Sequence, residues 1–303
     1  MKEPFRQFLR FIENNSGTPL HLTTRNPLLV ALMQPMKQAD RKFFFSGSEQ
    51  EITEHAAALI VAEAYRALAD HGRFSLVLAG GNSPRLLYQQ LAHGVSTEIL
   101  ERYALAMPDG SSECKQSLHF LPQKTWLFQG DERCLPPDHP DSNYRMIRET
   151  LLGQSGIAGN HLFRMAGEMA DPDAAAREYE AAIHSFFFSE KSLSPQQLPP
   201  FDLILLGLGE DGHTASLFPD NPEALQESGK WVVALNAPQA KPPGMRLTLT
   251  LPVINHARNI LFFTPGNKKG ELAKTIFLEE EQSVPASLVK PEQGRLYWFA
   301  AQL

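Results

Sequence analysis

Residues 201–220 read FDLILLGLGEDGHTASLFPD, and this stretch decides the fold. Its apolar run at 203–206 is too short for a helix and too apolar for a strand with one solvent-exposed face, so it predicts a strand buried on both faces. Glycines follow at once, and the titratable side chains of Asp211 and His213 lie among them. Ligands bind at the carboxyl ends of strands in open α/β sheets, so this stretch also predicts a binding site.

The three glycines of this stretch also match G-x-G-x-x-G, the dinucleotide-binding fingerprint. A true fingerprint needs a long helix after the third glycine and an acidic residue about 20 positions further on, for the ribose. Pro219 and Pro222 limit any helix to about two turns, and the next apolar run, at 231–236, ends without an acid. The pattern therefore argues against nicotinamide binding, while a tight turn with a solvated His213 stays open as a purely structural alternative.

Composition bounds the class of protein. The chain has 303 residues, of which 43% are hydrophobic, enough for one large domain or two smaller ones. Its net charge of −6 argues against general binding to nucleic acids or anionic membranes. No long apolar segment of membrane or secretory type is present, so we expect a cytoplasmic protein. Cys114 and Cys134 are the only cysteines, so neither a disulfide framework nor a zinc site is expected.

Strand-like and helix-like segments alternate along the chain. This alternation predicts a single α/β domain at 43–303, with a mostly parallel, Rossmann-like sheet and helices on both faces. Residues 1–42 form an N-terminal extension of unassigned role, and 104–124 read as a polar surface insert. We expect strands at 74–78, 125–128, 203–206, 231–235, 246–251, 260–263 and 296–299, and helices at 49–70, 85–91, 144–152, 172–188 and 268–277.

A second glycine-containing loop follows the strand expected at 74–78. It reads Gly80-Gly81-Asn82-Ser83-Pro84 and leads into a helical pattern. Ser83 is expected to cap that helix with Pro84 at its first position, so that backbone N–H groups at the positive end of the helix can hold a phosphate. An ordinary strand-to-helix turn is the alternative.

A charged group follows the strand expected at 125–128. After Gly130 come Asp131, Glu132 and Arg133, which places two acids and a guanidinium at the end of another buried strand. A solvated surface cluster is the alternative, because exposed charges are common. If all three loops belong to one parallel sheet, they should converge on a single pocket.

Four segments together resemble the 6-phosphogluconolactonase family, within the wider group that includes glucosamine-6-phosphate isomerases and deaminases. The resemblance covers the chain from about residue 44 to its C-terminus, and the segments occur in the family's order. They are AGGNSPRLLY at 79–88, GDERCLPPDHPDSNYRM at 130–146, GLGEDGHTASLFP at 207–219 and KPPGMRLTLTLPVIN at 241–255.

The lactonase branch matches better than the deaminase branch. Deaminases of this group usually continue Gly-His with an Ala-Phe-Asn-Glu-Pro type of sequence and have Asp-Glu-Tyr where this chain has Asp131-Glu132-Arg133. The resemblance implies hydrolysis of 6-phosphoglucono-δ-lactone to 6-phosphogluconate, in the oxidative pentose phosphate pathway. Asn82 departs from the family, which commonly has Ser or Thr there, and this departure can change the phosphate contacts.

The resemblance also implies roles for individual residues. His213 is expected to act as general base on water, since an imidazole titrates near neutral pH, with Asp211 orienting it. Arg133 is expected to bind either the developing oxyanion or the phosphate. We expect no cofactor and no metal. The residues expected to bind phosphate and substrate are Gly80, Gly81, Asn82, Ser83, Asp131, Glu132, Lys241 and Arg246.

Two other classes of function stay open at this point. A sugar-phosphate isomerase or deaminase would use the same phosphate contacts, with Asp131 or Glu132 as the base that removes a proton from the substrate. A non-enzymatic sugar-phosphate sensor would bind without turnover, although no DNA-binding helix pair with a basic face is evident. The expected partner is a small sugar phosphate rather than nucleic acid or membrane, and the oligomeric state is left open.

Overall fold

The computed structural model describes residues 41–103, 105, 117–188 and 197–301. Most of the N-terminal extension at 1–42 and most of the insert at 104–124 lie outside these residues. The chain from Lys42 onward forms one compact unit.

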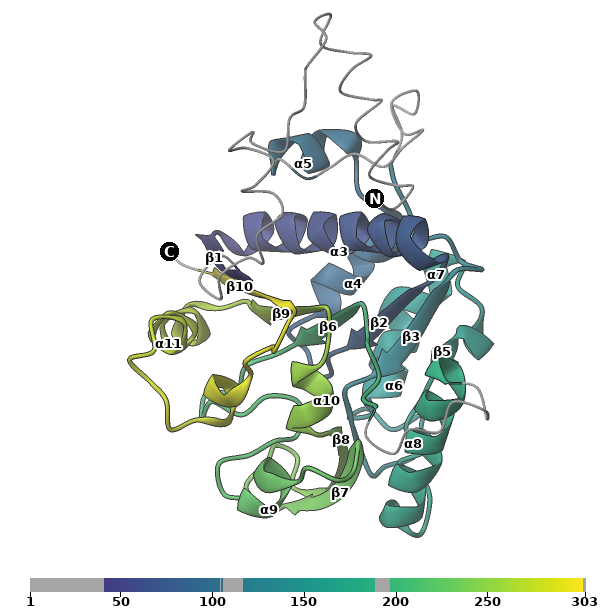
Figure 1. Ribbon diagram of the computed structural model, residues 1–303, viewed down its shortest axis with the longest axis vertical. Coiled ribbons are helices and arrows are strands. Elements are labelled where there is room, and N and C mark those ends of the chain that lie inside the picture. The colour runs from purple at the N-terminus through teal and green to yellow at the C-terminus, as the bar shows by residue number, and fades with distance from the viewer. Residues whose placement is uncertain (1–40, 104, 106–116, 189–196, 302–303) are drawn as a thin grey trace, which may run out of the picture. The chain divides into compact units, whose positions relative to one another are not determined.

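A seven-stranded parallel sheet runs through the middle of this unit (Figure 1). The order of its strands is β1-β10-β9-β6-β2-β3-β5, and every pairing between them is parallel. The mostly parallel α/β fold predicted from the sequence is confirmed. The strands are β1 (Lys42–Gly47), β2 (Phe74–Leu78), β3 (Thr125–Gln129), β5 (Leu162–Phe163), β6 (Leu203–Leu206), β9 (Asn259–Thr264) and β10 (Arg295–Ala301).

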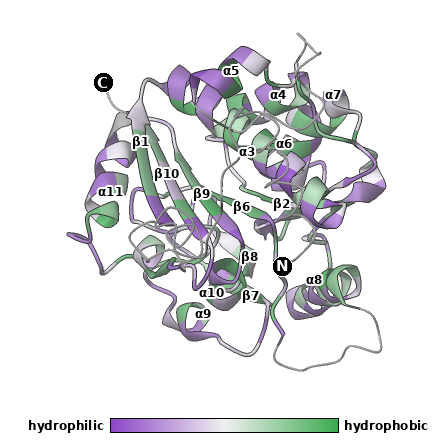
Figure 2. Cartoon of the chain, turned by 45° about the horizontal axis from the view of Figure 1, so that its top comes forward, coloured by the Kyte–Doolittle hydropathy of each residue, from purple (hydrophilic) through white to green (hydrophobic). Residues whose placement is uncertain are grey.

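Helices cover both faces of this sheet. Side chains of β2 alternate between the faces, so Leu76 and Leu78 pack in one hydrophobic cluster and Val77 in the other. Figure 2 shows the apolar strands enclosed between helices whose outer sides are hydrophilic. The first cluster includes α3 (Glu49–His71), α4 (Arg85–His93) and α5 (Thr97–Arg102), and the second includes α8 (Pro172–Phe187), α10 (Leu251–Asn255) and α11 (Asn267–Phe277).

The longest described helix, α3, has signals at both ends that explain its length. Ser48 and Glu51 form a reciprocal capping box, which satisfies donors of the first turn. Gly72 ends the helix in a left-handed conformation, at a φ of 82°, which glycine adopts without steric cost. The prediction of a helix at 49–70 is therefore confirmed to within one residue at its C-terminal end.

A small antiparallel sheet of three strands lies beside the parallel one. Its order is β4 (Asp131–Arg133), β8 (Gly244–Leu249) and β7 (Val232–Ala237). The sequence pattern did not distinguish β7 and β8 from the parallel strands. Only a short turn separates them, too short for the crossover that parallel neighbours need, so they pair as a hairpin. Gly130 alone separates β3 from β4 and therefore stands between the two sheets.

Two helices differ from the sequence-based expectation, α4 in its N-cap and α6 in its continuation. Ser83 does not cap α4: the N-cap is Pro84, with no side-chain hydrogen bond to the first turn, so the predicted serine cap was wrong. The helix expected at 144–152 begins as α6 (Asn143–Ile147), capped by Ser142, and continues as a π-helical turn. The remaining short elements are η3 (Arg148–Leu152), α7 (Gly153–Ser155), η4 (Gly159–His161), α9 (Pro222–Gln226) and η5 (Pro285–Leu288).

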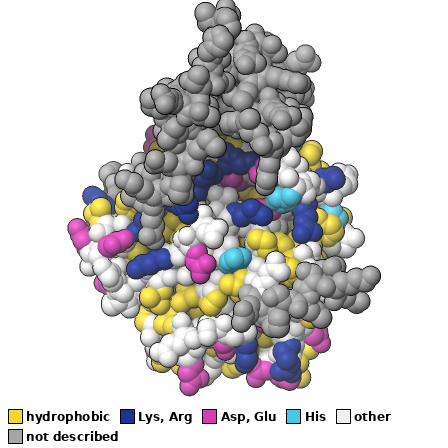
Figure 3. Space-filling model, in the orientation of Figure 1, with side chains coloured by type: hydrophobic (Ala, Val, Ile, Leu, Met, Phe, Trp, Pro, Cys, Tyr) yellow, Lys and Arg dark blue, Asp and Glu magenta, His cyan; other side chains and the backbone are white. Residues whose placement is uncertain are grey.

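Charged side chains of both signs lie on the surface. On the face drawn in Figure 3, Lys, Arg and His side chains gather around the middle, with carboxylates interspersed among them. No helix in the described ranges is both long and apolar enough to cross a membrane.

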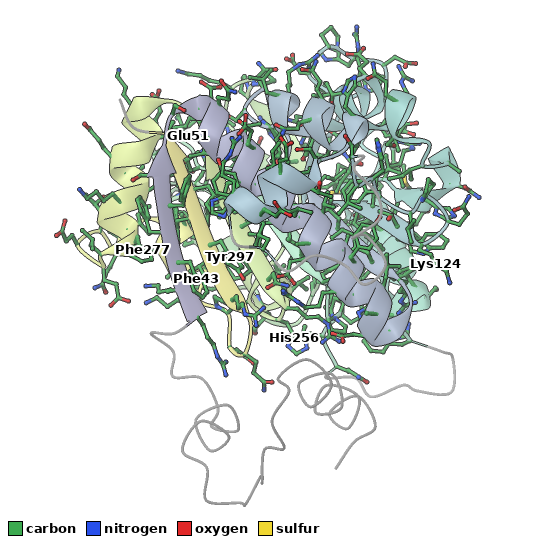
Figure 4. All side chains as sticks on the ribbon, turned by 90° about the horizontal axis from the view of Figure 1, so that it is seen from above. Phe43, Glu51, Lys124, His256, Phe277 and Tyr297 are labelled. Carbon is green, nitrogen blue, oxygen red and sulfur yellow. The ribbon has the colours of Figure 1, made fainter. Side chains whose placement is uncertain are left out.

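Strand β1 is fixed at one edge of the parallel sheet by aromatic contacts on both of its faces. On one face Phe43 stacks on Tyr297 of β10, with ring centroids 5.0 Å apart (Figure 4). On the other face Phe44 lies 5.1 Å from the ring of Phe277, at the end of α11. Such pairs add to the stability that backbone hydrogen bonding gives an edge strand.

Candidate active site

One cavity of about 570 Å³ opens at the carboxyl ends of the parallel strands. It lies where the strand order reverses, between β2 and β6, which is where open α/β sheets bind ligands. The loops after β2, β3 and β6 all reach it, so the predicted convergence is confirmed. Of the residues predicted for the site, only Glu132 does not line this cavity. The predicted residues that do line it are Gly80, Gly81, Asn82, Ser83, Asp131, Arg133, Asp211, His213, Lys241 and Arg246.

His213 and Asp211 form a hydrogen-bonded pair in the wall of the cavity. The distance from His213 Nδ1 to Asp211 Oδ1 is 2.5 Å, and the backbone N–H of His213 donates to the same oxygen at 3.2 Å. Partial burial alone would raise the pKa of Asp211, but the hydrogen bonds and charge of His213 outweigh it and lower that pKa. An ionised Asp211 accepts the Nδ1 proton, so the lone pair of the neutral imidazole is on Nε2.

The turn that carries this pair depends on two glycines. A methyl group at Gly209 would lie 2.1 Å from His213 Nδ1, so only glycine leaves room for the ring. Gly212 has a φ of 76°, in the left-handed region, and a Cβ there would lie 2.4 Å from Val284. The backbone closes the turn where the N–H of Gly209 donates to the carbonyl of His213 at 2.8 Å.

Two arginines contribute positive charge to the cavity wall. Arg133 on β4 and Arg246 on β8 are direct partners in the antiparallel pairing. Burial, followed by the nearby charge of Arg133, lowers the pKa of Arg246, which is only 4% exposed. Arg246 Nη2 donates to the carbonyl of Pro242 at 2.5 Å, and Arg133 Nη1 donates to that of Asp141. Neither guanidinium forms an ion pair with the described residues, so the wall favours an anion.

Asp131 presents a largely buried carboxylate to the same cavity. One of its oxygens accepts the hydroxyl hydrogen of Ser216 at 2.7 Å, and the other accepts from Asn143 Nδ2 at 3.2 Å. Ser216 and Asn143 are themselves buried, so this carboxylate has a fixed position. A fixed carboxylate can accept a hydrogen bond from a sugar hydroxyl.

Glu132 points away from the cavity, contrary to its predicted place in the site. It is 2% exposed, and its carboxylate accepts the backbone N–H groups of Asn143 at 2.8 Å and Tyr144 at 2.7 Å. Gln129 Nε2 donates to it at 2.9 Å. Burial raises the pKa of Glu132, although these hydrogen bonds act in the opposite direction. Its carboxylate thus holds the start of α6 against β4.

The loop after β2 presents backbone N–H groups at the cavity wall. The N–H of Gly81 already donates to Asn143 Oδ1 at 3.1 Å, so it is not available as predicted. The backbone N–H groups of Gly80, Asn82 and Ser83 make no hydrogen bond to the described part of the chain. They are therefore the donors that this loop offers to a ligand, and those of Asn82 and Ser83 lie nearest the start of α4.

Lys269 is a residue of the cavity wall that the sequence reasoning missed. It lies in the first turn of α11, and its Nζ donates to Ser83 Oγ at 3.4 Å. The available signal was the sequence Gly266-Asn267-Lys268-Lys269, which follows β9 as another strand-to-helix connection. Within the described ranges, no group of three or more His, Cys, Asp or Glu side chains is placed to hold a metal ion.

Comparison with known proteins identifies the family. Residues 47–298 match the family model described as glucosamine-6-phosphate isomerases/6-phosphogluconolactonase. The chain belongs to this family. Among curated members, the 6-phosphogluconolactonase of Synechocystis sp. is 36% identical over 257 residues, covering 84% of this chain and 93% of that protein. The 6-phosphogluconolactonase of Bos taurus is 35% identical over 264 residues, covering 86% and 91%.

Solved structures of the glucosamine-6-phosphate isomerase/6-phosphogluconolactonase family have the same fold. The 6-phosphogluconolactonase from Trypanosoma cruzi gives a TM-score of 0.67 at 25% identity, covering 88% of this chain and 96% of that one. A monomeric glucosamine-6-phosphate deaminase gives a TM-score of 0.61 at 21% identity, covering 86% and 97%. Because both branches of the family share the fold, the choice between their reactions depends on the site and on the nearer relatives.

Proposed function

We propose that this chain is a 6-phosphogluconolactonase, which hydrolyses 6-phosphoglucono-δ-lactone to 6-phosphogluconate in the oxidative pentose phosphate pathway. The observation that carries the proposal is the His213–Asp211 pair in the same cavity as two arginines that form no ion pair with the described residues. A base and an anion-binding wall are what hydrolysis of a phosphorylated lactone needs. The curated relatives of that name, which match most of the domain, support the same reaction.

In the proposed reaction His213 activates water. Its Nε2 removes a proton as the water oxygen attacks the lactone carbonyl carbon, and the Asp211 carboxylate stabilises the imidazolium that forms. The resulting tetrahedral oxyanion then collapses, and the bond from the carbonyl carbon to the ring oxygen breaks. The imidazolium returns its proton to the ring oxygen, which becomes a hydroxyl group. The new carboxylic acid loses its proton to solvent at neutral pH.

We assign the phosphate to the N–H groups of Asn82 and Ser83, with charge supplied by Lys269, Arg246 and Lys241. Backbone donors at a strand-to-helix turn, combined with lysine and arginine, are a common phosphate site. Gly80 and Gly81 contribute by allowing the backbone of the loop to come close to the ligand.

Arg133 lies beside Arg246 and can reach either the phosphate or the oxyanion. Removing an oxyanion donor lowers kcat for every lactone, whereas removing a phosphate contact raises KM for phosphorylated lactones alone. An Arg133→Ala variant measured on both kinds of substrate therefore assigns the residue.

The deciding experiment compares δ-lactone hydrolysis with phosphorylated and unphosphorylated sugars. We expect much faster hydrolysis of 6-phosphoglucono-δ-lactone than of glucono-δ-lactone, after correction for spontaneous hydrolysis. A protein that does not accelerate hydrolysis of the phosphorylated lactone would contradict the proposal.

Asp131 supports a second candidate function within the same family. A glucosamine-6-phosphate deaminase needs a carboxylate base near the C2 proton of its substrate, and Asp131 is a fixed carboxylate in the cavity. Release of ammonia from glucosamine 6-phosphate distinguishes this reaction, because the lactonase forms none.

A cytoplasmic location, without nucleic-acid or membrane partners, belongs to our proposal and is tested by cell fractionation.

A further inference from the structure

Asn143, the first residue of α6, uses both ends of its side-chain amide. Its Oδ1 accepts the backbone N–H of Gly81 at 3.1 Å. Its Nδ2 donates to the backbone carbonyl of Asp131 at 3.0 Å and to the carboxylate of Asp131 at 3.2 Å. Asn143 is 1% exposed and does not line the cavity, so its amide lies behind the cavity wall.

The groups that Asn143 joins come from separate strands. Gly81 belongs to the loop after β2, and Asp131 begins β4. The other oxygen of Asp131 accepts from Ser216, which belongs to the loop after β6. A continuous chain of hydrogen bonds therefore runs from Gly81 through Asn143 and Asp131 to Ser216, and it connects the three loops that form the cavity.

Only an amide of this size fits the position. The Gly81 contact needs an acceptor and the Asp131 contact needs a donor, so neither aspartate nor leucine can make both. Glutamine is one methylene longer, and no space is left on the Gly80 side. A methyl group at Gly80 would lie only 2.0 Å from Asn143 Nδ2.

We infer that Asn143 is a positioning residue of the hydrolytic site, which aligns the phosphate-binding loop with the Asp131 carboxylate. The inference rests on the proposed function for the identity of the ligand. Substrate does not touch Asn143. Its amide fixes the peptide of Gly81, and therefore the direction of the Asn82 and Ser83 N–H groups that follow.

The first test is Asn143→Ala, with binding measured apart from catalysis. Calorimetry gives the Kd of gluconate and of 6-phosphogluconate, and the Kd of gluconate divided by the Kd of 6-phosphogluconate isolates the contribution of the phosphate. We expect this ratio to fall roughly three- to tenfold, the range for losing one ordinary hydrogen bond in the alignment of the loop. For the lactone, kcat should fall and KM should rise together, because the variant disturbs both the phosphate-binding loop at Gly81 and the carboxylate of Asp131.

A further variant separates the ends of the hydrogen-bond chain. Ser216→Ala removes a partner of Asp131 without touching Gly81, so kcat should fall while the phosphate contribution to binding stays within about twofold of wild type. If Asn143→Ala fails to fold, Asn143→Ser carries the same test, because its shorter side chain cannot span the distance between Gly81 and Asp131.

Asn255 provides a matched control that does not line the cavity. Its amide also bridges two backbone groups, since Nδ2 donates to the Leu288 carbonyl at 3.1 Å and Oδ1 accepts the Lys290 N–H at 2.8 Å. Asn255→Ala should lower the melting temperature but leave the Kd ratio and kcat as in wild type. A merely structural Asn143 would behave in the same way.

The inference is overturned if Asn143→Ala or Asn143→Ser melts at a lower temperature but keeps the wild-type Kd ratio and kcat. Failure of the proposed function is distinguishable from this result. In that case the wild-type protein does not hydrolyse the lactone, whereas the effect of Asn143 on 6-phosphogluconate binding is still measured. A wild-type protein that binds 6-phosphogluconate no better than gluconate overturns both.

Discussion

Arg133 and Arg246 occupy directly opposed positions in the antiparallel pairing of β4 with β8, so two guanidinium groups lie close together in one cavity wall. Opposed residues in a sheet interact strongly, and like charges there are unfavourable. Burial is the main cause of the lowered pKa of Arg246, and the nearby charge of Arg133 lowers that pKa further. A bound anion relieves the repulsion between the two guanidinium groups, so ligand binding and stability should be coupled.

The coupling predicts that 6-phosphogluconate raises the melting temperature of the wild-type protein. At 100 times its Kd, a ligand specific for the folded state stabilises by about 2.7 kcal/mol. In Arg246→Ala we expect a smaller shift at the same concentration, because the affinity is lower. Differential scanning fluorimetry measures both, with gluconate as the unphosphorylated control. Equal shifts in the two proteins would argue against an anion contact at Arg246.

Arg246→Ala should raise KM for the phosphorylated lactone and leave kcat nearly unchanged. A phosphate contact that is equally strong in the ground and transition states contributes uniform binding. An unphosphorylated lactone should be almost indifferent to the change. If both substrates suffer alike, Arg246 instead supports the structure of the small sheet.

His213→Asn should lower kcat by about 10²- to 10⁴-fold, the usual contribution of a positioned general base. The affinity for 6-phosphogluconate should be nearly kept, because the phosphate contacts are untouched. Rates must be corrected for spontaneous hydrolysis, which rises in alkali. A folded variant with full kcat removes His213 from the mechanism.

Asp211 should titrate below its ordinary pKa of 3.8 and lose that property when His213 is replaced by alanine. Burial, which raises the pKa, stays in the variant, while the hydrogen bond and charge that lower it are lost. In the wild type the pair therefore contributes stability above pH 3.8 and loses it as the pH falls further. Carbon-detected NMR titration of the carboxyl group measures the shift. An unchanged pKa in the variant would mean that His213 is not the cause.

Gly209→Ala should lower kcat at least tenfold, because its methyl group would lie 2.1 Å from His213 Nδ1 and must displace the ring. Gly207→Ala is the matched comparison in the same loop, since a Cβ there meets nothing within 4 Å. We expect its kcat to fall far less. Comparable losses in the two variants would show that general loop strain, rather than the position of the imidazole, determines the rate.

The central parallel strands β2, β3 and β6 could be predicted because they carry continuous apolar runs followed closely by glycines, whereas the two-residue β5 at the sheet edge gives no such signal. The antiparallel sheet could not, because β4 is only three residues long and its charged sequence gives no strand signal. Whether two strands pair in parallel or antiparallel also depends on the length of the chain between them. The six residues between β7 and β8, 238–243, favour a hairpin, but this length was known only once the structure gave the ends of both strands.

For the site, the sequence indicated residues that lie next to glycine-rich strand ends and missed those brought in from elsewhere. Lys269 reaches the cavity from α11, far along the chain, and Asn143 lies behind the cavity wall, where it bonds to Gly81. Glu132 shows the converse. It stands between Asp131 and Arg133 in the same charged motif, but neighbouring residues of a strand point to opposite sides. Asp131 and Arg133 therefore face the cavity, whereas Glu132 faces α6.

Gly130 has a mechanical consequence for substrate binding. Its N–H donates to the carbonyl of Leu78 in the parallel sheet at 3.0 Å, and its carbonyl accepts from Leu249 in the antiparallel sheet at 2.9 Å. One residue between β3 and β4 thus bonds to both sheets, and these two bonds hold the sheets together at a corner. We therefore expect the arginines on the antiparallel sheet and the histidine after the parallel strand β6 to keep their spacing when the cavity is empty, so that substrate enters a preformed site.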